Sequence, residues 1–461
     1  MRADSRSATG SDPARLVDQD TGLISSEVYS DDLHSLEMER VFGNTWLFVG
    51  HESMLPKPRD YVTNYMGEDA IIVTRDDQNA IHVLLNKCRH RGNKVCLFDR
   101  GRAPSFICSY HGWSYAPNGT LVGVPRFDAV YEGDLVKEDW GLKEAVVGNY
   151  GGLLFATWSD DPMPLETYLG DARWYLETYY LEEDMGGIEF LHGKQRYRMP
   201  VNWKLLTENF AGDQYHFFVT HASLLKLTTD ARWKSKLHAF PKEGVRAFSV
   251  LANYRTGVPH GLLELRVGET IYEHELAAAK PLGKEAVEWV EERYRRLQER
   301  LKHFKAKPYG LHVGSLFPNF SFIGGGTALE GNAFYLWHPR GARETEVWQW
   351  CAVNKDAPDV IRRRQREGVV LLNSAAGMIA PDDHENFERM TQNLRTTQAK
   401  RLPFNYAMGL SRDDAADPRP PEWQTDAWPG KIAPEVTEAA QREFYRYWTQ
   451  LMGRAETAPR A

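Results

Sequence analysis

The chain has 461 residues, 42% of them hydrophobic, which is enough for about two or three domains with cores of their own. A formal net charge of −7 leaves no basic footprint, so neither nucleic acid nor an anionic membrane is expected as a partner. Four cysteines argue against a disulfide framework and fit a reducing compartment. No signal peptide or membrane span is predicted, so we expect a cytoplasmic protein in which about the first 20 residues are flexible. Its expected partners are small molecules and proteins.

The first third of the chain is predicted to form one helix followed by many short strands. Ser30 is a candidate N-cap for a helix whose first turn holds two aspartates. Turn residues separate the β-rich runs after it, which predicts hairpins. These runs are 46–49, 61–66, 70–74, 81–85, 106–107, 113–115 and 152–156. We therefore expect a small all-β domain over residues 41–157.

Two loops of this β region each carry one cysteine and one histidine. Cys88 and His90 follow one predicted strand, and Cys108 and His111 follow another. Two thiolates on one iron and two imidazoles on the other can hold a two-iron, two-sulfur cluster, which is a Rieske centre. Neutral histidines raise its potential to roughly −150 to +300 mV. The motif predicts transfer of single electrons.

The same donors also suit a structural zinc ion. Zinc sites usually pair like with like, as in a Cys-x-x-Cys hairpin, whereas here each loop contributes one cysteine and one histidine. The flanking segments 86–92 and 108–115 also resemble the cluster loops of Rieske oxygenases. The cluster is therefore favoured over zinc.

Beyond residue 157 the sequence changes to longer helical periodicity mixed with isolated strands. Helices are predicted at 164–180, 285–304 and 434–452, and strands at 314–323, 333–338 and 346–353. We expect residues 1–40 and 158–461 to form a second, catalytic domain with helices packed on an antiparallel sheet. The whole chain is then of the α+β class.

Asp213, His216 and His221 form the nucleus of a second metal site. The segment is predicted to start as a helix, on which Asp213 and His216, three apart, share a face. His221 lies about 140° further around a regular helix, so both histidines reach one ion only if the helix ends or bends between them. A further carboxylate comes from Asp382 or Asp383, at the predicted start of a helix. Two histidines and one carboxylate leave positions on an iron open for dioxygen and water.

Each of these signals is modest when taken alone. A His-x-x-x-x-His pair is more often two ordinary histidines, and two aspartates before a helix usually cap it. Their order along the chain is more specific: a Rieske motif, then the segment 202–221, then the segment 377–386. This order resembles the large (alpha) subunit of Rieske non-haem iron aromatic ring-hydroxylating dioxygenases over nearly the whole chain after residue 25.

The resemblance implies a role for each of these residues. Asp213 matches the aspartate that links an iron histidine to a cluster histidine of the neighbouring subunit, here His111. One [2Fe-2S] cluster and one Fe(II) are implied for each chain, and Asp382 is the alternative to Asp383 as iron ligand. The implied ligands are Cys88, His90, Cys108 and His111 for the cluster, and His216, His221 and Asp383 for the iron.

The resemblance also implies an activity and a set of partners. Both atoms of dioxygen add to an aromatic ring and give a cis-dihydrodiol. Electrons from NAD(P)H reach the cluster through a reductase, a ferredoxin or both, and then pass to the iron across a subunit boundary. A small beta subunit capping an alpha trimer, in an alpha3beta3 assembly, is expected.

The substrate stays open at this point. An aromatic hydrocarbon, including a polycyclic one, is favoured, and an arginine or lysine in the pocket would instead favour an aromatic acid of the phthalate or benzoate type. A monooxygenase or demethylase on the same scaffold is a further alternative, and a non-catalytic Rieske carrier is a remote one. The pocket candidates, each of which could equally be core, are Asn209, Phe210, Phe217, Leu225, Phe320 and Ile379.

Overall fold

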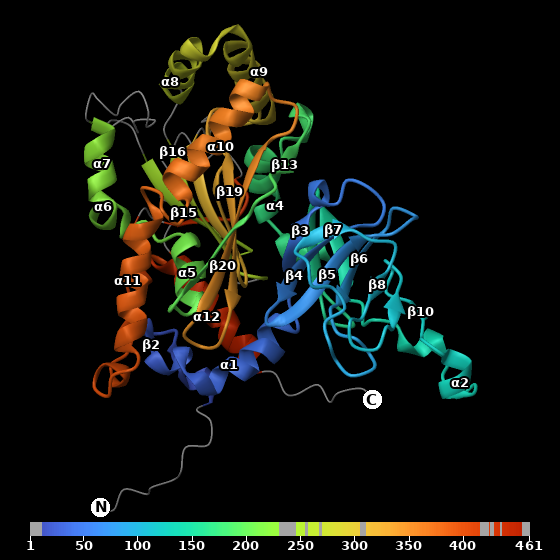
Figure 1. Ribbon diagram of the computed structural model, residues 1–461. Helices are drawn as coiled ribbons and strands as arrows, with labels where there is room; N and C mark the ends of the chain where they lie inside the picture. The colour runs from blue at the N-terminus through green and yellow to red at the C-terminus, as the bar shows by residue number, and fades with distance from the viewer. Residues whose placement is uncertain are drawn as a thin grey trace, which may run out of the picture. The chain divides into compact units, whose positions relative to one another are not determined.

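The computed structural model describes residues 12–229, 246–253, 257–266, 270–304, 310–414, 424, 428–433 and 436–453. Contacts between Cα atoms divide the chain into two compact units (Figure 1). The smaller unit comprises Phe42–Tyr168 and Glu189–Gly193, and the larger unit comprises Met1–Val41, Leu169–Ile188 and Lys194–Ala461. The domain limits expected from the sequence, 41–157 against 1–40 and 158–461, remain a prediction.

Three antiparallel sheets build the smaller unit, in the strand orders β6-β5-β4-β7, β11-β12-β3 and β10-β9-β8. Left-handed residues close two of the hairpins: Gly67, with a φ of 61°, between β4 and β5, and Asn79, with a φ of 66°, between β5 and β6. The unit also contains the short helix α2 (Phe127–Tyr131). The strands are β3 (Leu47–His51), β4 (Asp60–Met66), β5 (Asp69–Arg75), β6 (Ile81–Leu85), β7 (Arg100–Arg102), β8 (Phe106–Ile107), β9 (Ser114–Tyr115), β10 (Leu121–Gly123), β11 (Val146–Tyr150) and β12 (Leu153–Thr157).

A compact core includes the two cysteines that are predicted to bind the cluster. Cys88 and Cys108 are each 2% exposed and belong to one cluster of buried residues. Apolar and aromatic side chains from the short strands make up the rest of it, among them Tyr61, Ile72, Leu84, Phe106, Trp113 and Tyr115. The cysteine ends of both loops are therefore anchored in the interior of this unit.

One large antiparallel sheet organises the larger unit, in the order β20-β19-β18-β17-β16-β15-β22, with β14 also paired to β20. Every residue of β19 is buried, so both faces of the sheet are covered there. The strands are β14 (Gln195–Met199), β15 (Arg246–Ala252), β16 (His260–Arg266), β17 (Gly310–Leu316), β18 (Phe320–Gly324), β19 (Asn332–Pro339), β20 (Thr345–Asn354) and β22 (Lys431–Ala433). The chain is α+β, as the sequence predicted.

Helices cover this sheet. Helix α5 packs on β16 to β19, α10 on β19 and β20, and α12 on β15 and β16. A small sheet of β1 (Val17–Asp18), β2 (Leu23–Ile24) and β21 (Phe404–Asn405) belongs to the same unit. The helices are α1 (Asp31–Glu37), α5 (Trp203–Phe210), α6 (Phe217–Thr220), α7 (Ala222–Thr229), α8 (Thr270–Ala279), α9 (Lys284–Arg300), α10 (Asp359–Asn373), α11 (Ala380–Asn393) and α12 (Ala439–Met452).

A buried polar cluster fixes helix α5 to its neighbours α1 and α12. Lys204 of α5 forms an ion pair with Glu37 of α1, and both side chains are almost fully buried. The indole N–H groups of Trp203 and Trp448 donate to the same carboxylate at 3.1 and 2.8 Å. The carboxylate of Glu37 thus accepts from three donors, which offsets part of the cost of burying the charged pair. These bonds fix the helix that leads into the second predicted metal site.

Three predicted elements differ from the structure. The expected helix over 164–180 is interrupted at Gly170, whose φ of 49° is left-handed. The expected strand over 314–323 is two strands, β17 and β18, because Pro318 in the turn between them has no N–H to give to a ladder. The final helix begins at Ala439, and Pro434 lies outside the described residues. The pieces around Gly170 are α3 (Leu165–Leu169), α4 (Ala172–Tyr175) and the π-helical turn Leu176–Leu181.

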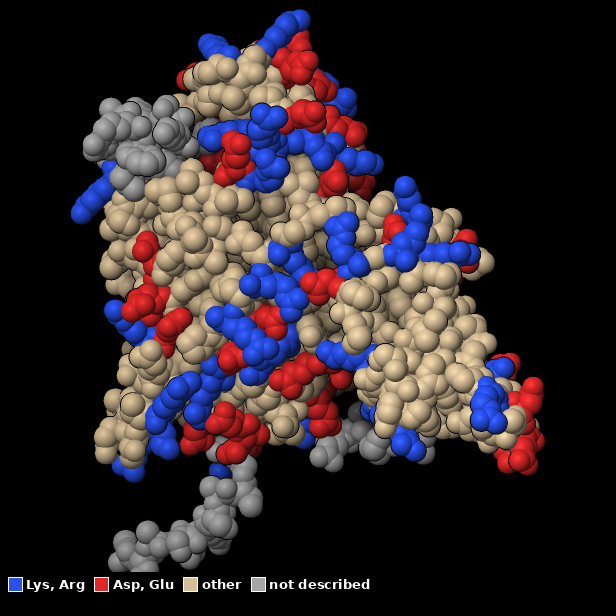
Figure 2. Space-filling view, in the orientation of Figure 1, with Lys and Arg blue, Asp and Glu red and all other residues tan. Residues whose placement is uncertain are grey.

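Charges of both signs are mixed over the face of the larger unit that Figure 2 shows, and neither sign dominates it. In the part of the chain that the structure describes, no helix combines the length and apolar character needed to cross a bilayer.

Candidate metal centres

Two tight turns of the smaller unit carry the four predicted cluster residues. In the first, the N–H of Gly92 donates to the carbonyl of Cys88 at 2.8 Å, and in the second the N–H of Gly112 donates to the carbonyl of Cys108 at 2.9 Å. Both glycines have left-handed φ angles, 76° and 74°, which residues with a Cβ rarely adopt. The two loops therefore share one backbone geometry, with a cysteine at the start of each turn.

The cysteines lie inside and the histidines lie toward the surface. His90 is half-buried and His111 is exposed, with their imidazole rings 4.6 Å apart. Burial disfavours the Cys108 thiolate, but hydrogen bonds from the backbone N–H groups of Tyr110 and His111 outweigh it and lower the pKa of this thiol. The Nδ1 atom of His90 is buried and has no hydrogen-bond partner. These features fit a cluster that needs thiolates, amide donors to sulfur and free imidazole nitrogens.

The spacing of these donors also bears on the zinc alternative. Among the described residues, the group with all its donor atoms within 4.8 Å of one another is His216, His221 and Asp383, and the cluster loops form no such group. The four donor atoms on a tetrahedral zinc ion would all lie close to one another. The donor atoms of the two loops are spaced more widely, which fits a two-iron cluster.

In the larger unit, the backbone after α5 brings the second group together. Asn202 caps α5, its Oδ1 accepting from the N–H of Lys204 at 3.0 Å, and the helix ends at Phe210. Asp213 therefore lies in a turn and does not share a helix face with His216, contrary to the sequence prediction. His216 instead begins the single turn α6 and His221 ends it. Helix α6 ends at Thr220, before His221, so the helix does end between the two histidines, as the sequence prediction required.

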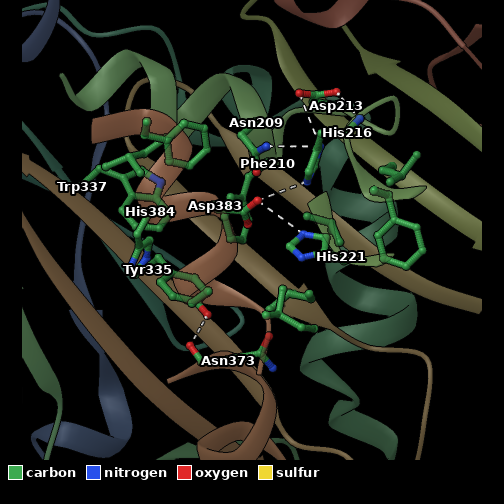
Figure 3. A pocket seen from close by; sticks show the side chains of 18 of the residues that line it. Asn209, Phe210, Asp213, His216, His221, Tyr335, Trp337, Asn373, Asp383 and His384 are labelled. Atoms are coloured by element: carbon green, nitrogen blue, oxygen red, sulfur yellow. Dashed lines mark hydrogen bonds and ion pairs between the residues drawn. The ribbon is translucent and has the colours of Figure 1, made fainter. Parts of the chain in front are cut away.

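Both histidines direct one ring nitrogen to the same carboxylate (Figure 3). The Nε2 atom of His216 lies 3.5 Å and that of His221 lies 3.4 Å from Oδ1 of Asp383. Asp383 comes from the first turn of α11, far along the chain. Burial, reinforced by repulsion from Asp213 and Asp382, raises the pKa of the Asp383 carboxyl to about 7 in spite of the attraction of His216. Such a crowded and buried donor set is one that a cation would stabilise.

A second carboxylate faces the other ring nitrogen of each histidine. Oδ2 of Asp213 lies 3.4 Å from Nδ1 of His216, and Oδ2 of Asp382 lies 3.5 Å from Nδ1 of His221. Metal-binding histidines commonly have a carboxylate on the nitrogen that does not bind the metal, which orients the ring and raises its basicity. The two aspartates that the sequence left as alternatives therefore occupy different positions, Asp383 facing both Nε2 atoms and Asp382 facing one Nδ1.

A cavity opens beside these residues (Figure 3). Four of the six pocket residues expected from the sequence line it, namely Asn209, Phe210, Phe217 and Ile379. Phe320 is not among the lining residues and instead packs in the core, its ring stacked on Phe334 at 5.8 Å. Leu225 lies in α7, but its side chain is outside what the structure describes.

Several lining residues were not anticipated from the sequence. Some come from strands of the sheet and others from α10 and α11, and their contribution depends on the packing of those elements. Period-two alternation along β16 to β19 was the only available signal, and it could not tell which face meets the cavity. The additional residues include Leu263, Val313, Ile323, Tyr335, Trp337, Asn373, His384 and Phe387.

Comparison with known proteins shows to which family the chain belongs. Residues 45–137 match the Rieske [2Fe-2S] domain, and residues 165–454 match the ring hydroxylating alpha subunit (catalytic domain). The chain belongs to the ring-hydroxylating dioxygenase alpha subunits. It is 37% identical to the biphenyl 2,3-dioxygenase subunit alpha of Rhodococcus jostii (strain RHA1), over 96% of this chain and 91% of that protein.

Other relatives of this alpha subunit agree. The benzene 1,2-dioxygenase subunit alpha of Pseudomonas putida is 35% identical over 95% of this chain and 92% of that one. A naphthalene 1,2-dioxygenase structure from Rhodococcus sp., bound to indole, superposes with a TM-score of 0.77 at 31% identity and covers 94% of each chain. A quaternary ammonium Rieske monooxygenase, at 16% identity and a TM-score of 0.66, shares the fold.

Family membership confirms the main predictions from the sequence. The chain is an enzyme with a Rieske [2Fe-2S] domain and a catalytic domain of the kind that binds mononuclear iron. As an alpha subunit it is one component of a multicomponent oxygenase and so works with partner proteins.

Proposed function

We propose that this alpha subunit adds both atoms of dioxygen to a neutral aromatic hydrocarbon and forms a cis-dihydrodiol. The observation that best supports this proposal is the group His216, His221 and Asp383, whose donor atoms lie within 4.8 Å of one another on the wall of a largely apolar cavity. The reaction joins the arene, dioxygen, two electrons and two protons in one product. Iron held by these three residues would supply the binding and reduction of dioxygen.

The cavity lining favours a hydrocarbon over an aromatic acid. Among the described residues that line it, none is a lysine or an arginine. A carboxylate substrate without such a partner would lose its hydration and gain no charge-assisted hydrogen bond in return. The relatives described as biphenyl, benzene and naphthalene dioxygenases support the same substrate class.

We assign the remaining roles as follows. Asp213 and Asp382 orient the two histidines, while apolar residues such as Phe210 and Phe217 hold the ring of the substrate and exclude water. In the smaller unit, Cys88 and Cys108 bind one iron of the cluster and His90 and His111 bind the other. The functional domains are residues 41–157 for the cluster, and 1–40 with 158–461 for catalysis.

We further propose that His111 of one chain faces Asp213 of the next within an alpha3beta3 assembly, with a reductase, a ferredoxin or both supplying electrons from NAD(P)H. Both side chains have the exposure that this requires: His111 is exposed and the Asp213 side chain is 37% exposed. An Asp213→Ala variant should keep the cluster spectrum but lose about 100-fold in product formation. The exposed Asp161 of the smaller unit provides a control, since Asp161→Ala should have normal turnover. Normal turnover of Asp213→Ala would refute the link.

The decisive experiment is turnover of biphenyl or naphthalene under ¹⁸O₂ with a surrogate reductase and ferredoxin. Two labelled oxygen atoms in a cis-diol product would support the proposal. A single labelled atom would instead identify a monooxygenase. Oxidation of phthalate or benzoate alone would overturn the substrate class, and reduction of the cluster without any oxygenated product would favour a carrier.

A further inference from the structure

One polar side chain in the cavity lining has no structural explanation. Asn373 is the last residue of α10 and is 9% exposed. It lines the cavity from the end opposite to His216 and Asp213 in the view of Figure 3. Neither the metal ligands nor the aspartates that orient them involve this residue.

The main chain of Asn373 is fixed by two buried side chains. Its carbonyl accepts from the hydroxyl of Tyr335 at 3.0 Å and from Nε2 of Gln349 at 2.7 Å. Nε2 of Gln349 also donates to the Tyr335 hydroxyl at 3.1 Å, which closes the network. The position of Asn373 is therefore set by its backbone and does not depend on its side chain.

The side-chain amide of Asn373 makes no hydrogen bond with any described residue. A primary amide offers two donors and an acceptor. An apolar ligand that filled the cavity would displace water from this amide and leave its hydrogen-bonding groups unsatisfied. The side chains that line the cavity from β16, β17 and β18 are the apolar Leu263, Val313 and Ile323. At this position an apolar residue of similar size would avoid the cost, so the amide is expected to serve a ligand.

We propose that Asn373 is a specificity-determining residue whose amide hydrogen-bonds a neutral polar substituent, such as a hydroxyl or carbonyl group, at the end of the aromatic substrate remote from the metal. The inference rests on the proposed function and narrows its substrate class. The amide carries no charge, so it selects neutral hydrogen-bonding groups over carboxylates. By holding that end of the molecule it also sets which ring bond lies beside His216 and Asp383.

The test uses two substrates of nearly equal shape, 4-hydroxybiphenyl and 4-methylbiphenyl, with the purified protein and its electron donors. The wild-type chain should have the higher kcat/KM for the hydroxyl compound. Asn373→Leu removes the amide but retains the volume and both main-chain hydrogen bonds. It should lower the ratio of the two kcat/KM values by about three- to tenfold and scatter the position of the new diol on 4-hydroxybiphenyl.

A matched asparagine outside the cavity provides the control. Asn393 is the last residue of α11, is exposed and does not line the cavity, so Asn393→Leu should leave the same ratio within about twofold of wild type. Cluster absorption and iron content of both variants show whether they fold, and Asn373→Ala replaces the leucine variant if it does not fold. An unchanged ratio in the Asn373 variant, or a wild-type preference for the methyl compound, overturns the proposal.

Failure of the underlying function is distinguishable. If wild type forms no doubly ¹⁸O-labelled diol from either biphenyl, the proposed function fails and the role of Asn373 fails with it. If wild type forms such diols but the ratio does not respond to Asn373→Leu, only the role of Asn373 fails.

Discussion

At the scale of single residues, the two aspartates at the start of α11 are chemically identical neighbours in different positions. Asp383 lies against the Nε2 atoms of both histidines, whereas Asp382 contacts only Nδ1 of His221. The sequence could not separate them, because consecutive residues at a helix start both satisfy a pattern of two aspartates. Their separation depends on how α11 packs beside α6.

This difference predicts unequal effects of two alanine substitutions. Asp383→Ala should lower the iron content from about three to about two atoms per chain and abolish product, because a direct ligand is lost. Asp382→Ala should retain the third iron with about 10- to 100-fold weaker affinity, because only the orientation of His221 suffers. Iron analysis of both variants against Fe(II) concentration measures this. Equal loss in the two variants would contradict the assignment.

Glu208 in α5 provides a prediction about pH. This carboxyl is buried: Oε1 accepts from the Tyr406 hydroxyl at 2.8 Å, and Oε2 has no hydrogen-bond partner. Burial raises its pKa to about 8 from a usual 4.5, against the hydrogen bonds from tyrosines that lower it. The folded chain thus binds this proton more tightly than the unfolded chain does, so the associated stability is complete below about pH 4.5 and is lost as the pH rises through 8.

Glu208→Gln should therefore remove a pH dependence. Glutamine resembles the protonated carboxyl at every pH, so the melting temperature of the variant relative to wild type should be higher at pH 8.5 than at pH 5 by about several degrees. Calorimetric scans at the two pH values test this. A variant whose offset from wild type is the same at both pH values would show that Glu208 does not titrate with folding.

At the scale of elements, sequence periodicity predicted regular segments well and their interruptions poorly. The charged helix expected at 285–304 is α9, Lys284–Arg300, because an amphipathic surface helix records its buried face in its own residues. The break at Gly170 left no such record, because glycine is tolerated within a helical pattern and its left-handed φ is set by tertiary packing. The turn after α5 was missed for the same reason.

The start of α5 allows a test of one element with an internal control. Asn202 caps the helix and also donates through Nδ2 to the carbonyl of Ala342 at 2.5 Å. Asn202→Ala should therefore destabilise the larger unit by about 2 kcal/mol, since a cap and a buried hydrogen bond are both lost. Ser30 stands at the corresponding position of α1 but makes no side-chain cap bond. Ser30→Ala should cost less than about 0.5 kcal/mol in the same denaturation assay.

At the scale of the whole molecule, the identities of the candidate metal-binding residues could be predicted from the sequence, but the cavity could not. Cysteine and histidine pairs can be recognised by their spacing in the sequence, because loops and short helices bring such donors together locally. The lining combines side chains from α5, α10, α11 and the strands β16 to β19, whose meeting depends on the packed sheet. Asn373 belongs to this second kind and had no sequence signal.

The two proposed centres share no residue and their donors come from different compact units, which predicts that one can be emptied without loss of the other. Anaerobic dialysis against an Fe(II) chelator should remove the mononuclear iron, because its three protein ligands leave open positions through which a chelator can compete. The cluster should keep its absorption, since Cys88 and Cys108 are buried and anchored in a packed core. Product formation should fall to background and return with Fe(II).

Zn(II) should occupy the same three ligands without restoring turnover, because it has no redox chemistry. A zinc-loaded protein that still oxygenates its substrate, or a cluster that bleaches in step with the loss of the third iron, would show that the two sites are not independent in this way.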